Sequence, residues 1–397
     1  MIQLELSIMA NDEELAKSLN PLLKIFEERH HIRVNLTAIP WNNGWSEISK
    51  YGIYGHGPDV SEIGTTWIGS LAAMQTLKPF TPQQVRAVGG AEAFFETNWQ
   101  SGLFAGIGQP YAIPWLGDVL VLYFWKDVLE KAGVSAHQAA FAGHDAFVNT
   151  LEKLQQSGIP YPLALTTFKQ NRNLHEASGW IWGAGGHLLS PDQKRVNFHE
   201  PAALNGLRKY FSLHRFISPE TLTASTSNDL FTREKAAVVL DGLGLWKATF
   251  KQKLNPGWEN RLGIAQVPEK AYVGGSSLVI WEHSRYAAEA FELVRFLATQ
   301  PAHIPGSPHS DQLPTRRDAI YMPSVETDEF HRTFMNVLQA GRSFPTVRLW
   351  GMLEERLTQE INNVWTELFA KPDLDLDECL RRHFEPLAKR INASLGN

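Results

Sequence analysis

Asp118 and Asp241 are the two carboxylates whose positions could serve a chemical site. Asp118 precedes an apolar run and Asp241 follows one, so we expect each where a predicted strand meets a loop. Two carboxylates that flank a sugar could act as the catalytic pair of a glycosidase. They could equally accept hydrogen bonds from sugar hydroxyls without any reaction, or be solvated strand ends. The pair alone therefore leaves these possibilities open.

Tryptophan is unusually frequent, with 13 residues in the chain. A flat indole face can stack on a sugar ring, and it can equally fill a core. Trp67 and Trp246 each follow a predicted strand end directly, which favours a role as a stacking surface. Trp41 comes just past a strand end, where a core role is as plausible as a ligand contact. Trp180 and Trp182 lie on a predicted helix, and we expect one of them, but not both, to face the ligand.

Motifs for catalysis and for metals are missing from the sequence. There is no His-Glu-x-x-His helix, no Gly-x-Ser-x-Gly elbow and no phosphate loop. The Gly242-Leu243-Gly244 stretch lacks the third glycine of a nucleotide-binding turn. Cys379 is the only cysteine, so we expect no intramolecular disulfide and no cysteine-based zinc site. We therefore expect no metal, no cofactor and no enzyme activity.

Length and charge set further limits on the chain. Its 397 residues favour two domains. A net charge of −5 argues against nucleic acid and anionic membrane as partners. No apolar run approaches the roughly 20 residues that span a membrane. The start, MIQLELSIMA, lacks the basic and long apolar regions of a signal peptide, so either a signal has been trimmed or the protein stays inside the cell.

The first 40 residues predict a β–α–β unit. Alternation from Leu4 to Ile8 predicts a strand, Asn11 can cap the following helix, and an apolar stripe continues to Phe26. A second strand is expected over residues 32–36. This order favours a parallel sheet.

Residues 57–80, GPDVSEIGTTWIGSLAAMQTLKPF, predict a buried strand that gives way to a helix. Thr65, Thr66 and Trp67 stand at the junction. In an open α/β sheet, ligands bind at the carboxyl ends of strands, so these residues are candidate contacts.

Three later stretches have similar organisation. Residues 111–134 predict a strand that is buried on both faces from Val119 to Tyr123 and then a helix. Residues 230–250 predict a short strand, a glycine loop and a helix with Trp246. Residues 262–300 predict two strands, with Gly274, Gly275 and Ser276 ahead of the second. Glycines there would permit a close approach of the backbone to ligand hydroxyls.

Taken in order, these stretches resemble the family 1 extracellular solute-binding proteins of ABC importers, which include maltose-binding-protein-like sugar binders. The resemblance covers nearly the whole chain, and it depends on the joint order and spacing of loose motifs. Trp125 replaces the asparagine that is usual in the family's asparagine-lysine-aspartate turn. This departure affects a turn rather than the site.

The resemblance implies an α/β fold of the type II periplasmic-binding-protein class, with two Rossmann-like lobes, a multi-strand hinge and a ligand cleft between the lobes. Lobe one would hold residues 1–113 and 268–308, and lobe two residues 114–267 and 309–397. The expected crossings between lobes are residues 111–119, 266–272 and 313–316.

The resemblance also implies that the chain binds a sugar or oligosaccharide and, by hinge closure, delivers it to permease subunits of an ABC transporter. It implies a periplasmic or extracellular location, with a signal or lipoprotein segment that is absent from this sequence, and we expect a monomer. Two alternatives are kept. One is a ligand-sensing module that reports to a kinase or cyclase, and the other is a glycoside hydrolase.

Asp118 falls where the family commonly has an acidic or polar ligand contact, and Arg348 and Trp350 fall where some members have one. Arg348 keeps an anionic ligand, such as a sugar acid or a phosphate ester, as a competitor of a neutral sugar. The full set of predicted ligand contacts is Asn11, Trp41, Thr65, Thr66, Trp67, Asp118, Trp180, Asp241, Trp246, Gly275, Ser276, Arg348 and Trp350.

Overall fold

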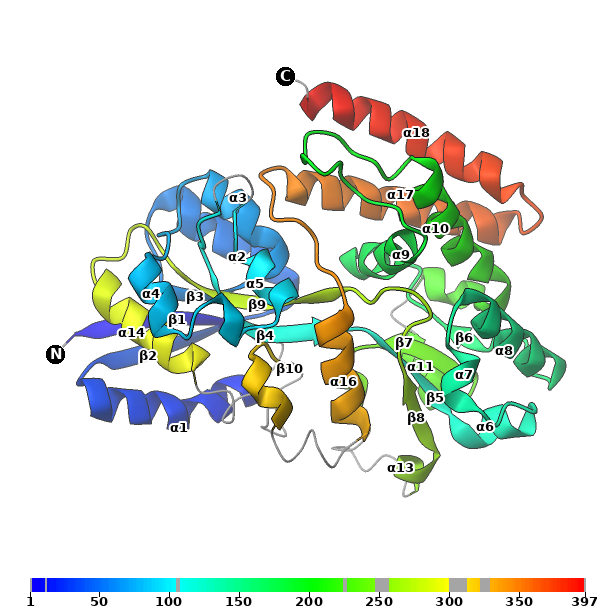
Figure 1. The fold of residues 1–397 in the computed structure, drawn as a ribbon, viewed down its shortest axis with the longest axis horizontal. Coiled ribbons are helices and arrows are strands. Elements are labelled where there is room, and N and C mark those ends of the chain that lie inside the picture. Colours follow the sequence, from blue (N-terminus) through cyan, green and yellow to red (C-terminus); the bar gives the residue numbers. More distant parts are fainter. Residues whose placement is uncertain are drawn as a thin grey trace. The chain divides into compact units, whose positions relative to one another are not determined.

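A computed structural model describes residues 2–10, 13–104, 108–223, 227–246, 257–299, 313–321 and 329–395. The chain divides into two units, each with its own sheet (Figure 1). Unit 1 comprises Met1–Val119, Val273–Gln339 and Ser343–Gly351, and unit 2 comprises Leu120–Tyr272, Ala340–Arg342 and Met352–Asn397.

Unit 1 is built on a six-stranded sheet of order β10-β4-β9-β3-β1-β2. β1 pairs in parallel with β2 and β3, whereas β9 is antiparallel to β3 and β4. Its strands are β1 (Gln3–Met9), β2 (Arg33–Ile39), β3 (Val60–Gly64), β4 (Ile113–Val119), β9 (Val273–Ile280) and β10 (Leu313–Pro314). Its helices are α1 (Glu13–His30), α2 (Trp41–Tyr54), η1 (Thr65–Trp67), α3 (Ile68–Ala73), α4 (Pro82–Ala87), η2 (Ala91–Ala93), α5 (Glu96–Ser101), α14 (Ala287–Ala298), η5 (Arg317–Tyr321) and α16 (Glu329–Ala340, whose last residue is in unit 2).

Both faces of this sheet are covered by helices. Leu4, Leu6 and Ile8 point to one side, where they share a core with residues of α1 and α14. Met9 and Ile63 point to the other side and pack with α2 and α3. The alternation of side chains along a strand thus supplies two cores, and the predicted opening β–α–β unit is confirmed.

Unit 2 holds a four-stranded sheet of order β6-β7-β5-β8, in which β6 and β7 are parallel and β5 is antiparallel to both of its neighbours. Its strands are β5 (Val121–Trp125), β6 (Leu163–Ala164), β7 (Val238–Asp241) and β8 (Leu262–Ala265). Its helices are α6 (Lys126–Lys131), α7 (His137–Ala140), α8 (His144–Gln156), α9 (Asn171–Gly183), α10 (Pro201–Phe211), η3 (Ser212–Phe216), η4 (Pro219–Leu222), α11 (Ser227–Thr232), α13 (Trp258–Arg261), α17 (Trp350–Ala370, whose first two residues are in unit 1) and α18 (Leu376–Leu395).

Close helix packing in unit 2 depends on glycine. A Cβ on Gly206 of α10 would lie 2.4 Å from the carbonyl oxygen of Trp180 in α9, so only glycine allows the two helices to approach this closely. A glycine pair follows the end of α9: Gly185 has a φ of +80°, and the amide of Gly186 donates to the carbonyl of Ile181 over 2.8 Å.

Two sequence predictions about strands are corrected. The strand expected over 119–123 is two strands, because β4 ends at Val119 and β5 begins at Val121 in the other sheet. Gly274, Gly275 and Ser276 lie inside β9 rather than before it. Gly275 has a φ of +122°, and a Cβ on it would lie 2.1 Å from the carbonyl oxygen of Leu116. The register of β4 against β9 shifts between Pro114 and Leu116, so this irregular pairing requires a glycine.

The chain passes between the units after Val119 and after Tyr272, and again on either side of residues 340–342 and after Gly351. Residues 313–316, expected as a crossing, lie in unit 1, where β10 pairs with β4. The predicted lobe boundaries stay a prediction. Among the described residues, every helix is too short or too polar to cross a bilayer.

Candidate functional site

Most of the predicted contacts in unit 1 meet at one edge of its sheet. β1, β2 and β3 are parallel, and β4 shares their direction because both β3 and β4 are antiparallel to β9. The carboxyl ends of these strands therefore share an edge, where an open α/β sheet binds ligands. The predicted contacts at this edge are Trp41, Thr65, Thr66, Trp67, Asp118, Gly275 and Ser276.

An indole cluster lies at this edge. The rings of Trp41 and Trp67 are 5.7 Å apart between centroids, and the rings of Trp45 and Trp67 are 5.9 Å apart. Trp41 and Trp67 are half-buried, and Trp45 is 41% exposed. A Cβ on Gly44 would lie 2.6 Å from the Trp67 ring, so the glycine lets this ring settle against α2.

Sequence reasoning missed Trp45. Its signal is the spacing WNNGW, which places Trp41 and Trp45 one helical turn apart, so that both lie on the same side of α2. Both residues lie in the first turns of α2, whereas the sequence analysis treated this stretch only as the continuation of the preceding strand. The half-buried Thr65 and Thr66 precede Trp67 in η1 and add hydroxyl groups beside the indole cluster.

A buried carboxyl lies beneath this edge. Glu62 is 0% exposed, and it accepts hydrogen bonds from the Oγ of Ser276 over 2.5 Å and from the amide of Met9 over 2.7 Å. Burial raises the pKa of Glu62 to about 7, although both hydrogen bonds oppose this shift. The predicted contact Ser276 is 1% exposed, and its hydroxyl donates a hydrogen bond to Glu62. Sequence reasoning missed Glu62, whose signal is one acidic residue within a buried strand.

The register of β9 links the remaining predictions in this sheet. Ser276 lies opposite Gly64, the last residue of β3, while Gly274 lies opposite Asp118 near the end of β4. β9 therefore separates the junction at Thr65 from Asp118 by the width of one strand. Asp118 is half-buried.

Arg348 and Trp350 lie in the segment that precedes α17. Arg348 is exposed, and its carbonyl oxygen accepts from the Oγ of Ser70 over 3.5 Å, so it lies beside α3, the helix that follows Trp67. Trp350 is 1% exposed, and its ring centroid is 4.4 Å from that of Phe344. Trp350 thus packs in a core, and a contact with a ligand stays a prediction for both residues.

In unit 2, Asp241 ends β7 and takes part in a charged network. Its Oδ1 accepts from Arg172 Nη1 over 2.9 Å and from the amide of Gly242 over 2.7 Å. Arg172 also donates to the carbonyl of Leu240 over 2.6 Å, so it is fixed against the end of this strand. The Oδ2 of Asp241 is buried and has no hydrogen-bond partner among the described residues. That oxygen is able to accept a further hydrogen bond.

The network continues into the core through Glu176. It accepts from Tyr210 Oη over 3.0 Å and from Arg172 Nε over 3.3 Å, and it is 4% exposed. Burial raises the pKa of Glu176 to about 7, against the opposing charge of Arg172. Sequence reasoning missed Arg172 and Glu176, which lie one turn apart on α9.

Trp180, a predicted ligand contact, is buried in unit 2. It is 6% exposed, and its ring meets His144 edge-on at 5.5 Å and Phe147 at 6.3 Å. It also lines a cavity of about 20 Å³, together with His175 and Tyr272. A cavity of this size holds about one water molecule and no sugar.

Trp246 is half-buried and lies in the helical turn that follows β7. The loop between them is held by Tyr123, whose hydroxyl donates to the carbonyl of Gly242 over 2.7 Å. Trp246 and Asp241 therefore belong to the same strand–helix junction, as predicted. Asn11 lies outside the described residues, and its predicted contact stays a prediction.

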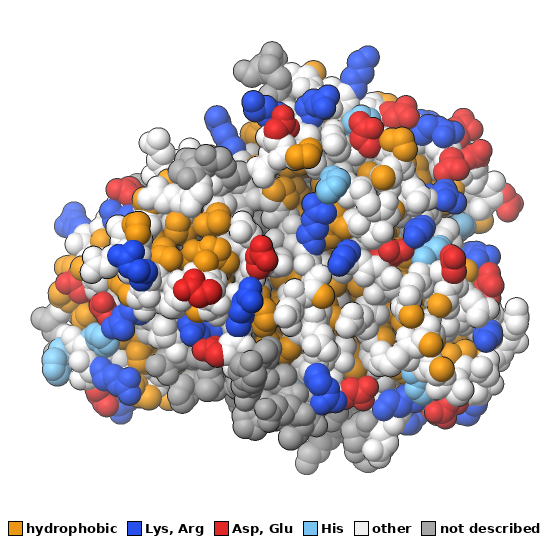
Figure 2. All heavy atoms as spheres, in the orientation of Figure 1, with side chains coloured by type: hydrophobic (Ala, Val, Ile, Leu, Met, Phe, Trp, Pro, Cys, Tyr) orange, Lys and Arg blue, Asp and Glu red, His pale blue; other side chains and the backbone are white. Residues whose placement is uncertain are grey.

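The surface charge is mixed. On the face that Figure 2 draws, basic and acidic side chains are interspersed among the described residues, and neither sign gathers into a broad field. This agrees with the modest net charge of −5.

Comparisons with known proteins agree with this architecture. The profile of a family described as bacterial extracellular solute-binding protein matches residues 22–331. A Brucella abortus protein named as a binding protein is 20% identical over 353 residues, which cover 86% of this chain and 83% of that protein.

Two solved structures extend the comparison. The sugar-binding protein MalE from Xanthomonas citri has a TM-score of 0.84 at 20% identity, and the match covers 99% of this chain and 97% of that one. An ABC transporter solute-binding protein from Thermotoga lettingae, bound with α-D-tagatose, has a TM-score of 0.80 at 20% identity and matches 100% of both chains. The predicted fold class, that of the type II periplasmic binding proteins, is confirmed.

Proposed function

Because the chain belongs to the bacterial extracellular solute-binding proteins, we propose that it binds a sugar or an oligosaccharide and delivers it to the permease of an ABC importer. The observation that carries the proposal is the cluster of Trp41, Trp45 and Trp67 at the carboxyl edge of the unit 1 sheet. Indole faces that remain partly exposed at such an edge suit the apolar faces of sugar rings. The solved structures with the same fold include a MalE described as sugar-binding and a protein bound with tagatose, which supports this ligand class.

Each unit supplies polar groups for the ligand. In unit 1, Thr65, Thr66 and Asp118 offer hydroxyl and carboxylate groups near the indole cluster. In unit 2, Asp241 offers its Oδ2 and Trp246 a further indole face. The cleft between lobes and its closure around the ligand, which shifts an equilibrium between open and closed forms, belong to this proposal. Asn11, Gly275, Ser276 and Arg348 stay proposed contacts. Trp180 and Trp350, which are 6% and 1% exposed, pack in cores and take the lowest place among the proposed contacts.

Binding without reaction is part of the proposal. A glycosidase needs a carboxylic acid that keeps its proton near neutral pH and reaches the substrate. The carboxyls with pKa raised to about 7, Glu62 and Glu176, are 0% and 4% exposed, and both are held by hydrogen bonds inside their units. Asp241 is fixed by Arg172 rather than aimed at a partner carboxylate. The related proteins are binding proteins, which supports the same conclusion.

The proposed setting follows from the family. A member of an extracellular family acts in the periplasm or outside the cell, and a lipid anchor upstream of this sequence would hold it near the permease. We propose that the protein acts as a monomer. A sensing module would bind the same ligand, so a permease gene beside this one is what distinguishes transport from sensing.

The experiment is a thermal-shift screen over neutral sugars, oligosaccharides, sugar acids and sugar phosphates, followed by calorimetry on each hit. We expect a neutral sugar or oligosaccharide to raise the melting temperature. Trp67→Ala should weaken its binding, whereas Tyr54→Ala, on the far end of α2 and 67% exposed, should leave the affinity unchanged. If only sugar acids or sugar phosphates raise the melting temperature, the ligand is anionic and the proposed class of neutral sugars is wrong. Turnover of a glycoside that is lost in Asp118→Asn would replace binding by hydrolysis.

A further inference from the structure

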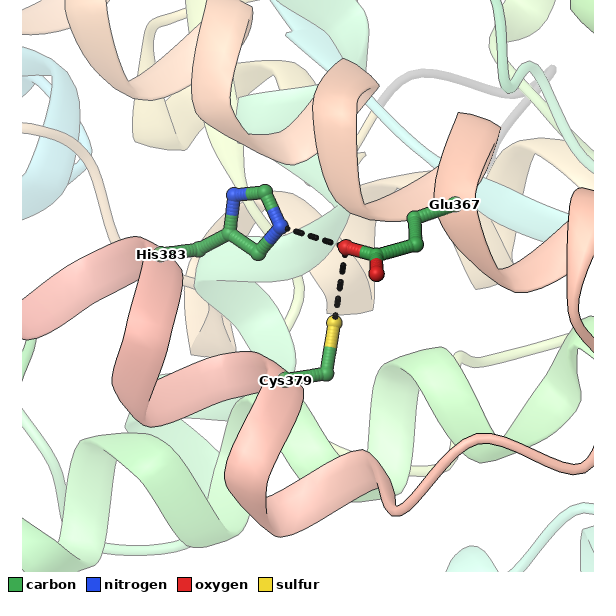
Figure 3. Close-up of side chains that lie close together, drawn as sticks. All are labelled: Glu367, Cys379 and His383. Atoms are coloured by element: carbon green, nitrogen blue, oxygen red, sulfur yellow. Dashed lines mark hydrogen bonds and ion pairs between the residues drawn. The ribbon is translucent and has the colours of Figure 1, made fainter.

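Three side chains with metal-binding chemistry meet where α17 and α18 pack in unit 2. Cys379 and His383 lie one turn apart on α18, and Glu367 reaches them from α17 (Figure 3). One ligand atom from each residue lies within 4.8 Å of the other two. These residues lie on different elements from the candidate ligand contacts in unit 2, which follow β7.

The distances are close to those of a tetrahedral metal site. The Cys379 Sγ is 3.8 Å from Glu367 Oε2, and the His383 Nε2 is 2.9 Å from the same oxygen. Zinc binds sulfur at about 2.3 Å and nitrogen or oxygen at about 2.0–2.2 Å, so ligand atoms in a tetrahedral site lie roughly 3.3–3.7 Å apart. The sulfur–oxygen distance is already close to this range, and the nitrogen–oxygen distance is shorter than it by about 0.4 Å. Sulfur and ring nitrogen lie within 4.8 Å of each other, so side-chain shifts of up to about 1 Å would bring the three atoms around one ion.

The histidine is already oriented for this role. Its Nδ1 is 2.5 Å from Glu360 Oε1, one of the carboxylates of α17. A carboxylate on one ring nitrogen leaves the other nitrogen as the metal ligand, an arrangement that accompanies most histidine ligands of zinc. Glu360 thus directs Nε2 toward Cys379 and Glu367.

Burial and ligand type narrow the choice of ion. Cys379 is 1% exposed, while the side chains of His383 and Glu367 are 16% and 23% exposed. A buried sulfur with an open side toward solvent leaves room for water as a fourth ligand. Sulfur and imidazole ligands select zinc and similar transition metals over magnesium or calcium.

We propose that Glu367, Cys379 and His383 bind a Zn²⁺ ion that links α18 to α17. Binding replaces protons: the thiol gives its proton to water as the Zn–S bond forms, and His383 releases the proton on Nε2 as the Zn–N bond forms. The sequence expectation of no cysteine-based zinc site concerned ligand sets with several cysteines, whereas this proposal combines one cysteine with a histidine and a glutamate.

The contacts without metal define the competing role, an ion-pair network between helices. Arg382 donates to both oxygens of Glu367 over 2.6 and 2.7 Å, and His383 bridges two carboxylates. The two roles predict different effects for Arg382→Gln. In a zinc site, Arg382 competes with the ion for Glu367, so its removal should tighten zinc binding. In an ion-pair network, its removal changes only the stability of the metal-free protein.

The experiment titrates the untagged full chain with Zn²⁺ against a chromophoric chelator, and with Co²⁺ as a spectroscopic substitute. We expect one Zn²⁺ per chain and an absorption band in the near ultraviolet from a bond between thiolate and Co²⁺. Cys379→Ser and His383→Gln should lower the affinity by at least about tenfold, and Glu360→Gln by about 10–100-fold. His30→Gln with His31→Gln, a pair on α1 and just beyond it, is the matched control and should change nothing.

Near-ultraviolet circular dichroism shows whether each variant keeps its packing. If Cys379→Ser unfolds, the variants Arg382→Gln and Glu360→Gln still test the site, because both retain the Cys379 thiol. Tighter zinc binding by Arg382→Gln, with the thiolate band, supports the site. A cobalt spectrum without that band, or zinc binding that survives in Cys379→Ser and disappears in the His30 and His31 control, overturns it. Sugar binding is measured separately, so failure of this site leaves the proposed function untouched.

Discussion

The Oγ of Ser276 donates a hydrogen bond of 2.5 Å to a carboxyl oxygen of Glu62, and the two residues lie 214 positions apart in the sequence. The bond joins β3 to β9 beneath the edge where the indole cluster lies. Its carboxyl is fully buried and has a pKa of about 7, so its protonation changes near neutral pH.

Glu62 should make the stability of unit 1 depend on pH. Because the folded-state pKa, about 7, is above the usual value of 4.5, the folded protein holds this proton more tightly than the unfolded chain. The contribution is fully present below pH 4.5 and is lost as pH rises through about 7, a loss of up to roughly 3 kcal/mol in the free energy of unfolding. Urea unfolding at several pH values measures it.

Glu62→Gln is the matching variant, because it carries no charge, its amide oxygen can accept from the amide of Met9, and its NH2 group can donate to the Oγ of Ser276. As pH rises from 5 to 8, wild type should lose the stability that the proton on Glu62 contributes, whereas Glu62→Gln should not. The variant should therefore gain stability relative to wild type by roughly that amount. Glu47→Gln, on the surface of α2, is the control. Equal pH dependence in wild type and Glu62→Gln would show that the carboxyl ionises without cost.

Two tryptophans of unit 2 should respond differently to truncation. Trp180→Ala removes a core ring that is 6% exposed and should cost about 3–5 kcal/mol of stability. Trp246→Ala, at a half-buried position after β7, should weaken sugar binding by more than about 1 kcal/mol and leave the fold intact. Melting temperature without ligand and calorimetry with it separate these effects. A destabilised Trp246→Ala protein with unchanged affinity would place Trp246 in the core.

Asp118 should contribute to affinity as an acceptor for ligand hydroxyls. Asp118→Ala should weaken binding by about 1.5–3 kcal/mol, the range for hydrogen bonds to charged groups. Glu28→Ala, at an exposed position of α1, is the control and should bind as wild type does. Unchanged affinity of Asp118→Ala in calorimetry would exclude Asp118 from the site.

Local patterns predicted much of the fold. The strand from Gln3 to Met9 and the apolar stripe of α1 that continues to Phe26 are both encoded by neighbours within a few residues. Periodicity and capping depend on such short spacing, so one sequence suffices to find them. The break between β4 and β5 was missed, because both halves are apolar and only their partner strands differ.

The candidate site was harder to predict, because the hydrogen-bond partners of its side chains are distant in the sequence. Nothing near Ser276 in the sequence indicates that its hydroxyl donates a hydrogen bond to Glu62, and the partner of Asp241 is Arg172, 69 positions earlier. Trp350 shows the same difficulty: its core position depends on Phe344 and on burial rather than on residue type. Spacing can nominate polar and aromatic residues, whereas packing decides which of them face solvent.

Cys379 has a practical consequence for studying the protein. Its side chain is buried, and burial together with the charge of Glu367 raises the pKa of its thiol. A thiol that is both inaccessible and protonated reacts slowly with maleimides and iodoacetamides. A cysteine introduced at an exposed position, such as Tyr54 on α2, would then be labelled selectively in the otherwise natural chain. The chain is thus a ready scaffold for a fluorescent reporter of its own ligand.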